Sequence, residues 1–170
     1  EPRSGLAIRP VGPGDIPDLC GLLNEIIRIG GTTAHETPMT VETFLEVFFK
    51  AQIQISFLVA EGKDGELLGF QVLTTHEKLP DDWADIATFA RVGSQAAGVG
   101  GALFAETLAM ARRFGLAALN ATIRADNIGG LAYYERMGFV TWKVDRDVPL
   151  KSGLRVDRVS KSYLLAGDEE

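Results

Sequence analysis

The segment Thr88–Gly115 constrains the fold of this chain more than any other. Its first five residues, Thr-Phe-Ala-Arg-Val, favour a strand, and the Gly-Ser-Gln that follows ends the strand with small, turn-tolerant residues. From Val99 onward, apolar residues recur at helical spacing until Gly115, a residue typical of a helix C-terminal stop. The sequence therefore predicts a strand, a glycine-bearing loop and a long helix, with the loop glycines at the helix N-terminus.

This position suits the loop to an anionic ligand. The first N–H groups of a helix have no intrahelical partner and lie at the positive end of its dipole, which favours a phosphate or pyrophosphate. Gly98 and Gly100 would let a large anion approach the backbone, because neither has a Cβ. The P-loop pattern does not fit, since Val99 and Gly100 stand where Lys and Ser/Thr are required. The dinucleotide fingerprint fails too, because it needs Gly or Ala at Leu103.

Two motifs give the chain its family resemblance. The pattern Q/R-x-x-G-x-G/A reads Gln95-Ala96-Ala97-Gly98-Val99-Gly100 and resembles the acyl-CoA pyrophosphate loop of the GCN5-related N-acetyltransferases, the GNAT superfamily. The segment 127–139, Asn-Ile-Gly-Gly-Leu-Ala-Tyr-Tyr-Glu-Arg-Met-Gly-Phe, resembles that family's signature N-x-x-(A)-x-x-x-Y-E-K/R-x-G-F. Both motifs fall in the family's order and spacing, and the resemblance covers essentially the whole chain.

The resemblance implies the α/β (α+β) fold of the acyl-CoA N-acyltransferases, a mixed, mostly antiparallel central sheet of about seven strands flanked by about four helices. The residue patterns agree with this fold. Strands are expected over 6–10, 55–61, 67–75, 83–92, 119–123, 139–144 and 156–164. Helices are expected after an Asp15 cap, after a Thr40 cap, over 99–114 and up to Met137, and residues 145–155 are expected to form a turn.

Length and composition limit the number of domains, the kinds of partner and the cellular compartment. A chain of 170 residues predicts one domain, 1–170, with frayed ends at 1–4 and 166–170. The net charge of −6 and the scattered Lys and Arg residues argue against a nucleic-acid partner. A single cysteine, no apolar signal-peptide run and no stretch long enough for a membrane span favour a cytoplasmic protein without a membrane partner. Because many GNAT relatives dimerise, the resemblance adds a homodimer as an expectation.

The resemblance implies acetyl-CoA as co-substrate and no metal. Its diphosphate would lie on backbone N–H groups of residues 95–101, and because Gln95-Ala96-Ala97 is uncharged, binding would depend on the backbone and the helix dipole. The pantetheine arm would pair with the preceding strand, whose N–H near Phe89 or Ala90 would polarise the thioester carbonyl. The residues expected to bind the cofactor are Phe89, Ala90, Val92, Gln95, Ala96, Ala97, Gly98, Val99, Gly100, Gly101, Asn127 and Tyr133.

Two residues are candidates for proton transfer. Tyr134 stands four residues before Gly138, at the place of the family's general acid, and a phenol with a pKa near 10 is protonated at neutral pH. Tyr133 offers a second hydroxyl, and both tyrosines could instead only pack the helix on the sheet. Asp85 stands where phosphinothricin-type enzymes carry a Glu, so it is the candidate base, acting directly or through water; an exposed carboxylate without a role is the alternative.

The acceptor region is expected between the first two helices. Residues 24–40 loosely resemble the subgroup that acetylates phosphinothricin and methionine sulfone or sulfoximine, and Thr33, His35 and Glu36 are the expected substrate-binding residues. A solvated polar loop is the alternative. The resemblance thus implies an N-acetyltransferase that moves the acetyl group of acetyl-CoA directly to a primary amine of a small molecule, with an amino-acid-like acceptor among the possibilities. A protein or peptide N-acetyltransferase and a non-catalytic acyl-CoA-binding module are the other hypotheses.

Overall fold

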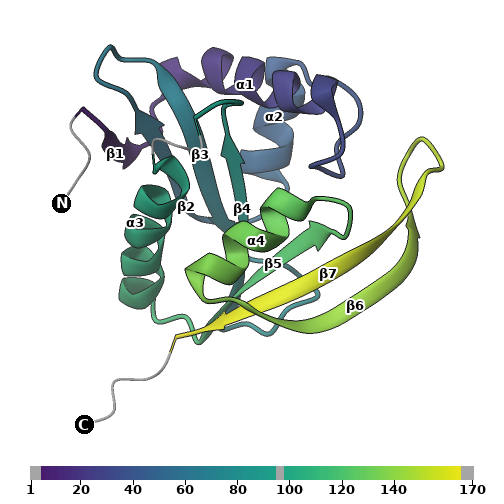
Figure 1. Ribbon diagram of the computed structural model, residues 1–170. Helices are drawn as coiled ribbons and strands as arrows, with labels where there is room; N and C mark the ends of the chain where they lie inside the picture. Colours follow the sequence, from purple (N-terminus) through teal and green to yellow (C-terminus); the bar gives the residue numbers. More distant parts are fainter. Residues whose placement is uncertain (1–4, 95–97, 166–170) are drawn as a thin grey trace, which may run out of the picture.

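The computed structural model describes residues 5–94 and 98–165. Within these ranges the chain forms one seven-stranded sheet of order β1-β2-β3-β4-β5-β7-β6 (Figure 1). All neighbouring strands are antiparallel except β4 and β5, which confirms the mixed, mostly antiparallel sheet. The predicted frayed ends, and Gln95, Ala96 and Ala97 of the loop, lie outside the described residues. The strands are β1 Ala7–Pro10, β2 Gln54–Glu61, β3 Leu67–Thr74, β4 Trp83–Ala90, β5 Ala118–Arg124, β6 Val140–Pro149 and β7 Arg155–Leu164.

Four α-helices accompany the sheet in the described residues: α1 Ile16–Ile29, α2 Val41–Leu45, α3 Val99–Phe114 and α4 Ile128–Met137. A 3₁₀ turn, Pro13–Asp15, precedes α1, and a π-helical turn, Glu46–Lys50, continues α2. None of the helices described in 5–94 and 98–165 has the length and apolar character needed to cross a membrane.

The two predicted helix caps have different outcomes. Thr40 caps α2 as expected, because its hydroxyl accepts a hydrogen bond from the Thr43 N–H. The side chain of Asp15 does not cap α1, because it is used by the preceding turn. Its carboxylate accepts the Gly12 N–H at 2.7 Å and pairs with the Arg9 guanidinium at 2.7 Å. Asp15 therefore ties the entry of α1 to β1.

The helices cover the two faces of the sheet unequally. Helices α1 and α2 pack on one face of β2 to β4 around an aromatic cluster in which Phe57 and Phe70 stack at 5.3 Å and Phe44 contacts both. Helices α3 and α4 pack on the opposite face, over a core that includes residues of β4 and β5. The described residues of the α1–α2 core include none from β5, β6 or β7. On the face that carries α1 and α2, the described part of strands β5, β7 and β6 is therefore not covered by this apolar core.

The last hairpin corrects one prediction. Residues 145–155 were expected to form a turn, but β6 continues to Pro149 and only a short turn separates it from β7. Strand β6 lies at the edge of the sheet and is mostly exposed, and beyond Val144 it loses the alternation of apolar and polar residues that marks a strand. A register shift follows Asp145, and Asp147, with φ of 52°, donates its N–H to the Asp157 carboxylate at 2.9 Å.

The parallel pair at the centre positions the site. Strands β4 and β5 are paired only from Trp83↔Ala118 to Asp85↔Asn120. Beyond that point β4 continues against β3 as far as Ala90, but no described strand pairs with it on its β5 side (Figure 1). The backbone groups of β4 that face β5 beyond Asp85 therefore have no strand partner among residues 5–94 and 98–165.

Candidate active site

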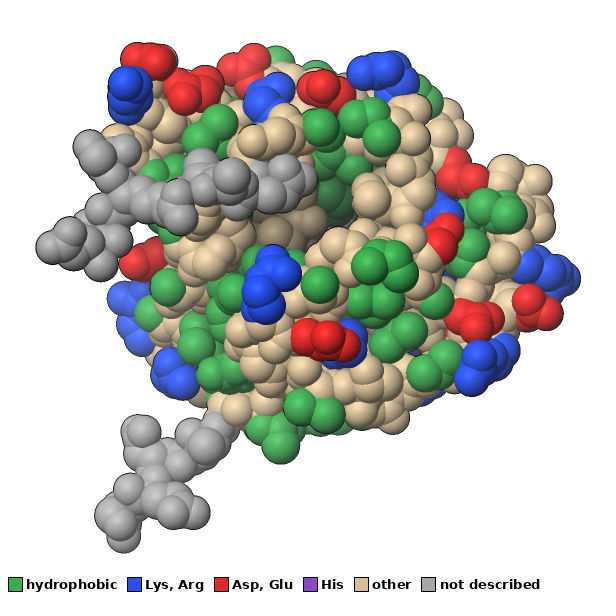
Figure 2. All heavy atoms as spheres, viewed as in Figure 1, with side chains coloured by type: hydrophobic (Ala, Val, Ile, Leu, Met, Phe, Trp, Pro, Cys, Tyr) green, Lys and Arg blue, Asp and Glu red, His purple; other side chains and the backbone are tan. Residues whose placement is uncertain are grey.

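A cavity of about 1510 Å³ opens where β4 and β5 separate. Its walls come from the α1–α2 connection, β4, the start of α3, β5, α4 and the β6–β7 hairpin. Figure 2 shows a hollow near the middle of this face, floored mainly by polar side chains and backbone. The cavity brings together most of the site residues predicted from sequence: Thr33, His35, Asp85, Phe89, Ala90, Val92, Gly98, Gly100, Gly101, Asn127, Tyr133 and Tyr134.

Two other predicted residues have different surroundings. The Val99 side chain is fully buried in the core with Leu58 and Leu103, so only its backbone could meet a ligand. Glu36 accepts hydrogen bonds from the Ser152 N–H at 2.8 Å and hydroxyl at 2.6 Å, and these bonds lower its pKa. Glu36 therefore joins the α1–α2 connection to the turn of the β6–β7 hairpin.

The start of α3 forms an anion cradle of backbone groups. Gly98 precedes the helix in the left-handed conformation, with φ of 74°. The N–H groups of the first turn have no intrahelical acceptor, and this turn carries no acidic residue. Gly101 has open space where a Cβ would lie, so a ligand could approach its backbone closely. These features fit a diphosphate held by main-chain N–H groups and the helix dipole.

The structure gives Gly100 a different role from the one its sequence suggested. A Cβ at this position would lie 2.6 Å from the Tyr133 ring. The Tyr133 hydroxyl also donates a hydrogen bond to the Gly100 carbonyl at 2.7 Å. The absence of a side chain at Gly100 therefore lets α4 pack closely on the start of α3.

The two neighbouring tyrosines differ in where their protons go. Burial raises the pKa of both phenols, so both are protonated at neutral pH. The Tyr133 proton is used in the bond to Gly100. The Tyr134 hydroxyl lies 2.8 Å from the Thr88 hydroxyl, and either of these two oxygens can donate. When Thr88 donates, the Tyr134 proton is free for another acceptor, so the geometry favours Tyr134 over Tyr133 as an acid.

A buried glutamine, which the sequence analysis did not single out, orients the hydroxyl groups of Thr88 and Tyr133. Gln71 is fully buried on β3, and its Nε2 donates to the Thr88 hydroxyl at 2.9 Å and to the Tyr133 hydroxyl at 3.1 Å. By occupying an acceptor position on Thr88, Gln71 leaves the Thr88 proton available for Tyr134. The signal in the sequence was a single polar amide inside the otherwise apolar strand Leu-Leu-Gly-Phe-Gln-Val-Leu-Thr.

Asp85 is a half-buried carboxylate held by a short chain of hydrogen bonds. It accepts a bond from Asn120 Nδ2 at 2.9 Å, and Asn120 Oδ1 accepts one from Trp142 Nε1 at 2.9 Å. Burial raises the pKa of Asp85, while the Asn120 bond and the nearby His76 oppose that rise. Sequence reasoning found Asp85 but not Asn120 or Trp142, which β5 and the exposed edge strand β6 bring to it.

The acid and base candidates lie on different faces of β4. Phe89 is four positions after Asp85 on the same strand, so the two side chains point to the same face of the sheet. Phe89 packs against the α1–α2 core on that face. Thr88 points to the other side, toward Tyr134 of α4. Asp85 and Thr88 are three residues apart, about 10 Å along the strand at about 3.3 Å per residue. The cavity between β4 and β5 joins the two faces, and a water molecule could bridge part of that distance.

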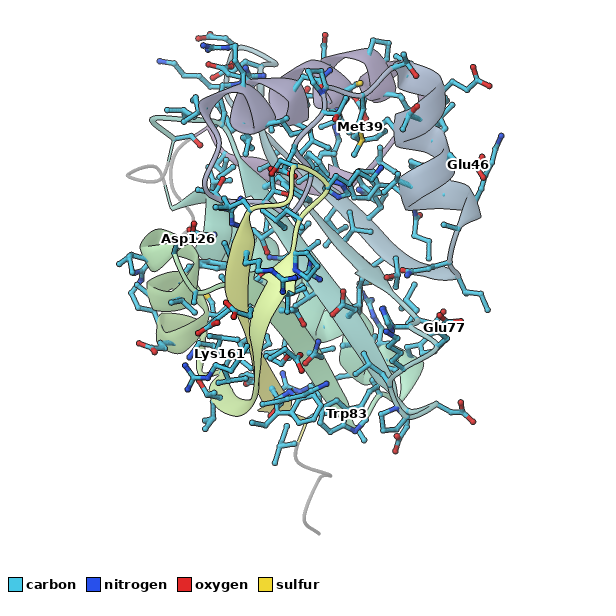
Figure 3. All side chains as sticks on the ribbon, turned by 90° about the vertical axis from the view of Figure 1, so that its right-hand side faces the viewer. Met39, Glu46, Glu77, Trp83, Asp126 and Lys161 are labelled. Carbon is cyan, nitrogen blue, oxygen red and sulfur yellow. The ribbon has the colours of Figure 1, made fainter. Side chains whose placement is uncertain are left out.

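The α1–α2 connection covers one side of the cavity. The buried Arg124 pairs with Asp126 at 2.7 Å and donates to the Thr33 carbonyl at 2.9 Å. Asn127 caps α4 by accepting the Gly130 N–H at 2.9 Å, and its amide donates to the Thr32 carbonyl at 3.2 Å. Figure 3 shows the turn of the β6–β7 hairpin beside the part of the connection that carries Met39, with Trp83 at the other end of the molecule.

These features define a class of protein. A central sheet opened between two parallel strands, a glycine-bearing helix start at the opening and a buried phenol beside it are the features expected of an acyl-CoA-dependent acyltransferase. The family comparison agrees: the sequence model of the acetyltransferase (GNAT) domain matches residues 21–159. The chain therefore belongs to the GNAT acetyltransferase family, and its enzymatic class is the acetyl-CoA-dependent N-acetyltransferases.

Solved structures share the fold over nearly the whole chain. A GCN5-related N-acetyltransferase from Kribbella flavida is 20% identical, with a TM-score of 0.82 over 95% of this chain and 98% of that one. The protein yncA from Salmonella typhimurium, solved with acetyl-CoA, is 17% identical, with a TM-score of 0.82 over 98% of each chain. A phosphinothricin acetyltransferase from Sinorhizobium meliloti, in complex with acetyl-CoA, is 16% identical, with a TM-score of 0.79 over 95% and 89%. The search of curated proteins found no significant match.

Proposed function

We propose that this protein transfers the acetyl group of acetyl-CoA directly to a primary amine of a small molecule. The observation that carries the small-molecule assignment is the cover over the acceptor side of the cavity. The α1–α2 connection is bonded to the start of α4 through Asn127, to β5 through Arg124 and to the β6–β7 turn through Glu36. A cavity that is walled on its acceptor side by this tethered connection suits a compact acceptor better than a polypeptide, which needs an open groove.

The residues present fit acetyl-CoA. Its diphosphate would be held by the N–H groups at the start of α3, where Gly98 turns the chain into the helix and Gly101 leaves the backbone accessible. Its pantetheine amides would pair with the side of β4 that loses its partner after Asp85. An N–H near Phe89 or Ala90 would then stabilise the negative charge that develops on the thioester oxygen.

The side chains supply the proton transfers. Asp85 accepts a proton from the acceptor ammonium group, through water, which leaves the amine a lone pair. The amine nitrogen attacks the thioester carbonyl, a C–N bond forms, and the C–S bond breaks with its electron pair moving to sulfur. Tyr134 donates its proton to that thiolate, and the second proton, which the attacking nitrogen loses as it becomes an amide, returns to the phenolate through water. Until it returns, Thr88 stabilises the phenolate through the hydrogen bond that it donates.

A thiol-release assay with acetyl-CoA tests the proposal. The panel contains small primary amines, including methionine sulfone, and lysine-bearing peptides. We expect turnover with small amines and little with peptides. Faster turnover of peptides would favour a protein acetyltransferase. Acetyl-CoA binding in calorimetry, without turnover of any amine or peptide, would favour an acyl-CoA-binding module.

A further inference from the structure

Three charged residues form a row across the part of the sheet that α1 and α2 leave uncovered. Arg124 of β5 lies opposite Arg158 of β7, and Arg158 lies opposite Asp145 of β6. Residues directly opposite each other in a sheet point to the same face, and Arg124 shares its face with Asn120, four residues earlier. All of these residues line the cavity. The row therefore belongs to the acceptor side of the site.

The outer members of this row are paired with other groups. Arg124 is neutralised by Asp126, with 2.7 Å between nitrogen and oxygen. Asp145 pairs with Lys143 at 3.5 Å. The side chain of Arg158, between them, has no hydrogen bond or ion pair to any residue that the structure describes, and its Nε is buried without an acceptor. Arg124, opposite it on one side, carries the same charge, and Asp145, opposite it on the other side, pairs with Lys143, so the Arg158 Nε is left without an acceptor.

The other basic side chains of the cavity do not share this property. Arg146 is 80% exposed and pairs with Asp157 at 3.1 Å. Lys78 and Arg136 are exposed, so water satisfies them. Among the described lysines and arginines that line the cavity, Arg158 alone is partly buried and lacks a counter-charge.

The strand register places Arg158 near the reacting end of the cavity. Arg124 is four residues beyond Asn120, the partner of Asp85, and Phe89 is four residues beyond Asp85. Arg158, opposite Arg124, is therefore level along the strands with the end of β4 proposed to hold the thioester. A guanidinium with a free Nε–H binds a carboxylate through two parallel hydrogen bonds.

We propose that Arg158 binds the carboxylate of the acceptor, so that the substrates are primary amines that also carry a carboxylate. The proposal rests on the proposed function and adds the substrate class and the residue that selects it. A carboxylate would give the buried Nε an acceptor and would supply the ion-pair partner that Arg158 lacks among the described residues.

Matched acceptors test the assignment. The ratio of kcat/KM for methionine sulfone to that for its amide is measured in the wild type, Arg158→Met, Arg158→Lys and Arg146→Met. We expect the ratio to fall at least tenfold in Arg158→Met through the KM of the acid, to recover in part in Arg158→Lys and to stay unchanged in Arg146→Met. An unchanged ratio in Arg158→Met, or an equal loss for acid and amide, would overturn the proposal.

Binding measurements separate this proposal from the proposed function. Calorimetry measures the acid and the amide on CoA-loaded wild type and Arg158→Met, and acetyl-CoA on both proteins as a check that the variant folds. Tighter binding of the acid to the wild type, lost in Arg158→Met, supports the carboxylate site even where turnover is slow. Equal binding of acid and amide by the wild type overturns it. Absence of acetyl-CoA binding by the wild type would instead overturn the proposed function.

Discussion

The two halves of the central sheet are built for different purposes. Strands β2 to β4 are covered on both faces, with the aromatic cluster of α1 and α2 on one side and α3 on the other. Strand β5 and part of β7 are covered by α4 on one face, β6 is mostly exposed, and the other face of β5 and β7 carries Asn120, Arg124 and Arg158 at the cavity. The comparison teaches that the apolar half holds strand β4 rigidly in place for the cofactor. The side chains on the polar face of the other half can change without disturbing the hydrophobic core.

The largest expected effect tests the apolar half. Phe70→Ala removes a ring that stacks on Phe57 at 5.3 Å and on Phe89 at 4.8 Å. We expect the free energy of unfolding to fall by about 3–5 kcal/mol, as for other buried phenylalanines. Thr122→Ala, in the polar half, is the matched control and should cost about 1 kcal/mol. Equal losses in urea unfolding would contradict the division of the sheet.

Tyr134→Phe tests the acid at the boundary between the halves. Loss of a general acid reduces rates by about 10²–10⁴-fold, so we expect kcat to fall by about 10²-fold or more. Acetyl-CoA binding should be unchanged, because the ring stays in place. Tyr133→Phe is the control: it removes the hydrogen bond to the Gly100 carbonyl, so it should lower the free energy of unfolding and leave kcat nearly unchanged. An unchanged rate in Tyr134→Phe would exclude this phenol from the mechanism.

Asp85→Asn separates function from stability. We expect kcat/KM to fall by about 10²-fold, the lower end for loss of a general base. Because burial raises the Asp85 pKa, its ionised form destabilises the fold, and stability is lost as pH rises through the folded-state pKa. The variant should therefore have a higher Tm than the wild type at pH 8, by about 2–4 °C for each kcal/mol relieved. This difference should shrink toward pH 4, and a lower Tm at pH 8 would contradict the assignment.

The sequence predicted those parts of the site that depend on local patterns. The loop glycines, the long helix α3 and the helix that ends at Met137 were all found, because each is specified within a few residues. Gln71, Asn120 and Trp142 were missed, since their partners are brought to them by strand pairing. Polar residues on exposed or half-buried strands carry no periodic signal of their own.

The role expected of Glu36 shows the same limit. Its partner, Ser152, is 116 residues away and lies in a turn whose position depends on the length of β6. Since the exposed edge strand β6 was predicted too short, this contact could not be anticipated. The position of Arg158 in the cavity likewise depends on the register of β7 between β5 and β6.

The smallest expected effect concerns the polar half alone. Trp142 is 48% exposed and contacts Trp83 edge to face at 5.6 Å, so much of its surface already meets water. Its N–H fixes the Asn120 amide, which in turn donates to Asp85. In Trp142→Phe the ring contact is kept and only this donor is lost. We expect little change in Tm and a poorer hydrogen bond from Asn120 to the carboxylate.

The expected readout is the acid limb of the kcat/KM profile, which reports ionisation in the free enzyme. The Asn120 bond opposes the rise in the Asp85 pKa, so weakening it should move this limb to higher pH. Asn120→Ala, which removes the donor altogether, should move the limb further in the same direction. A limb that stays in place in both variants would mean that Asp85 is not the group whose ionisation controls the reaction. The polar half would then hold the acceptor without taking its proton, and another group or bulk water would have to serve as the base.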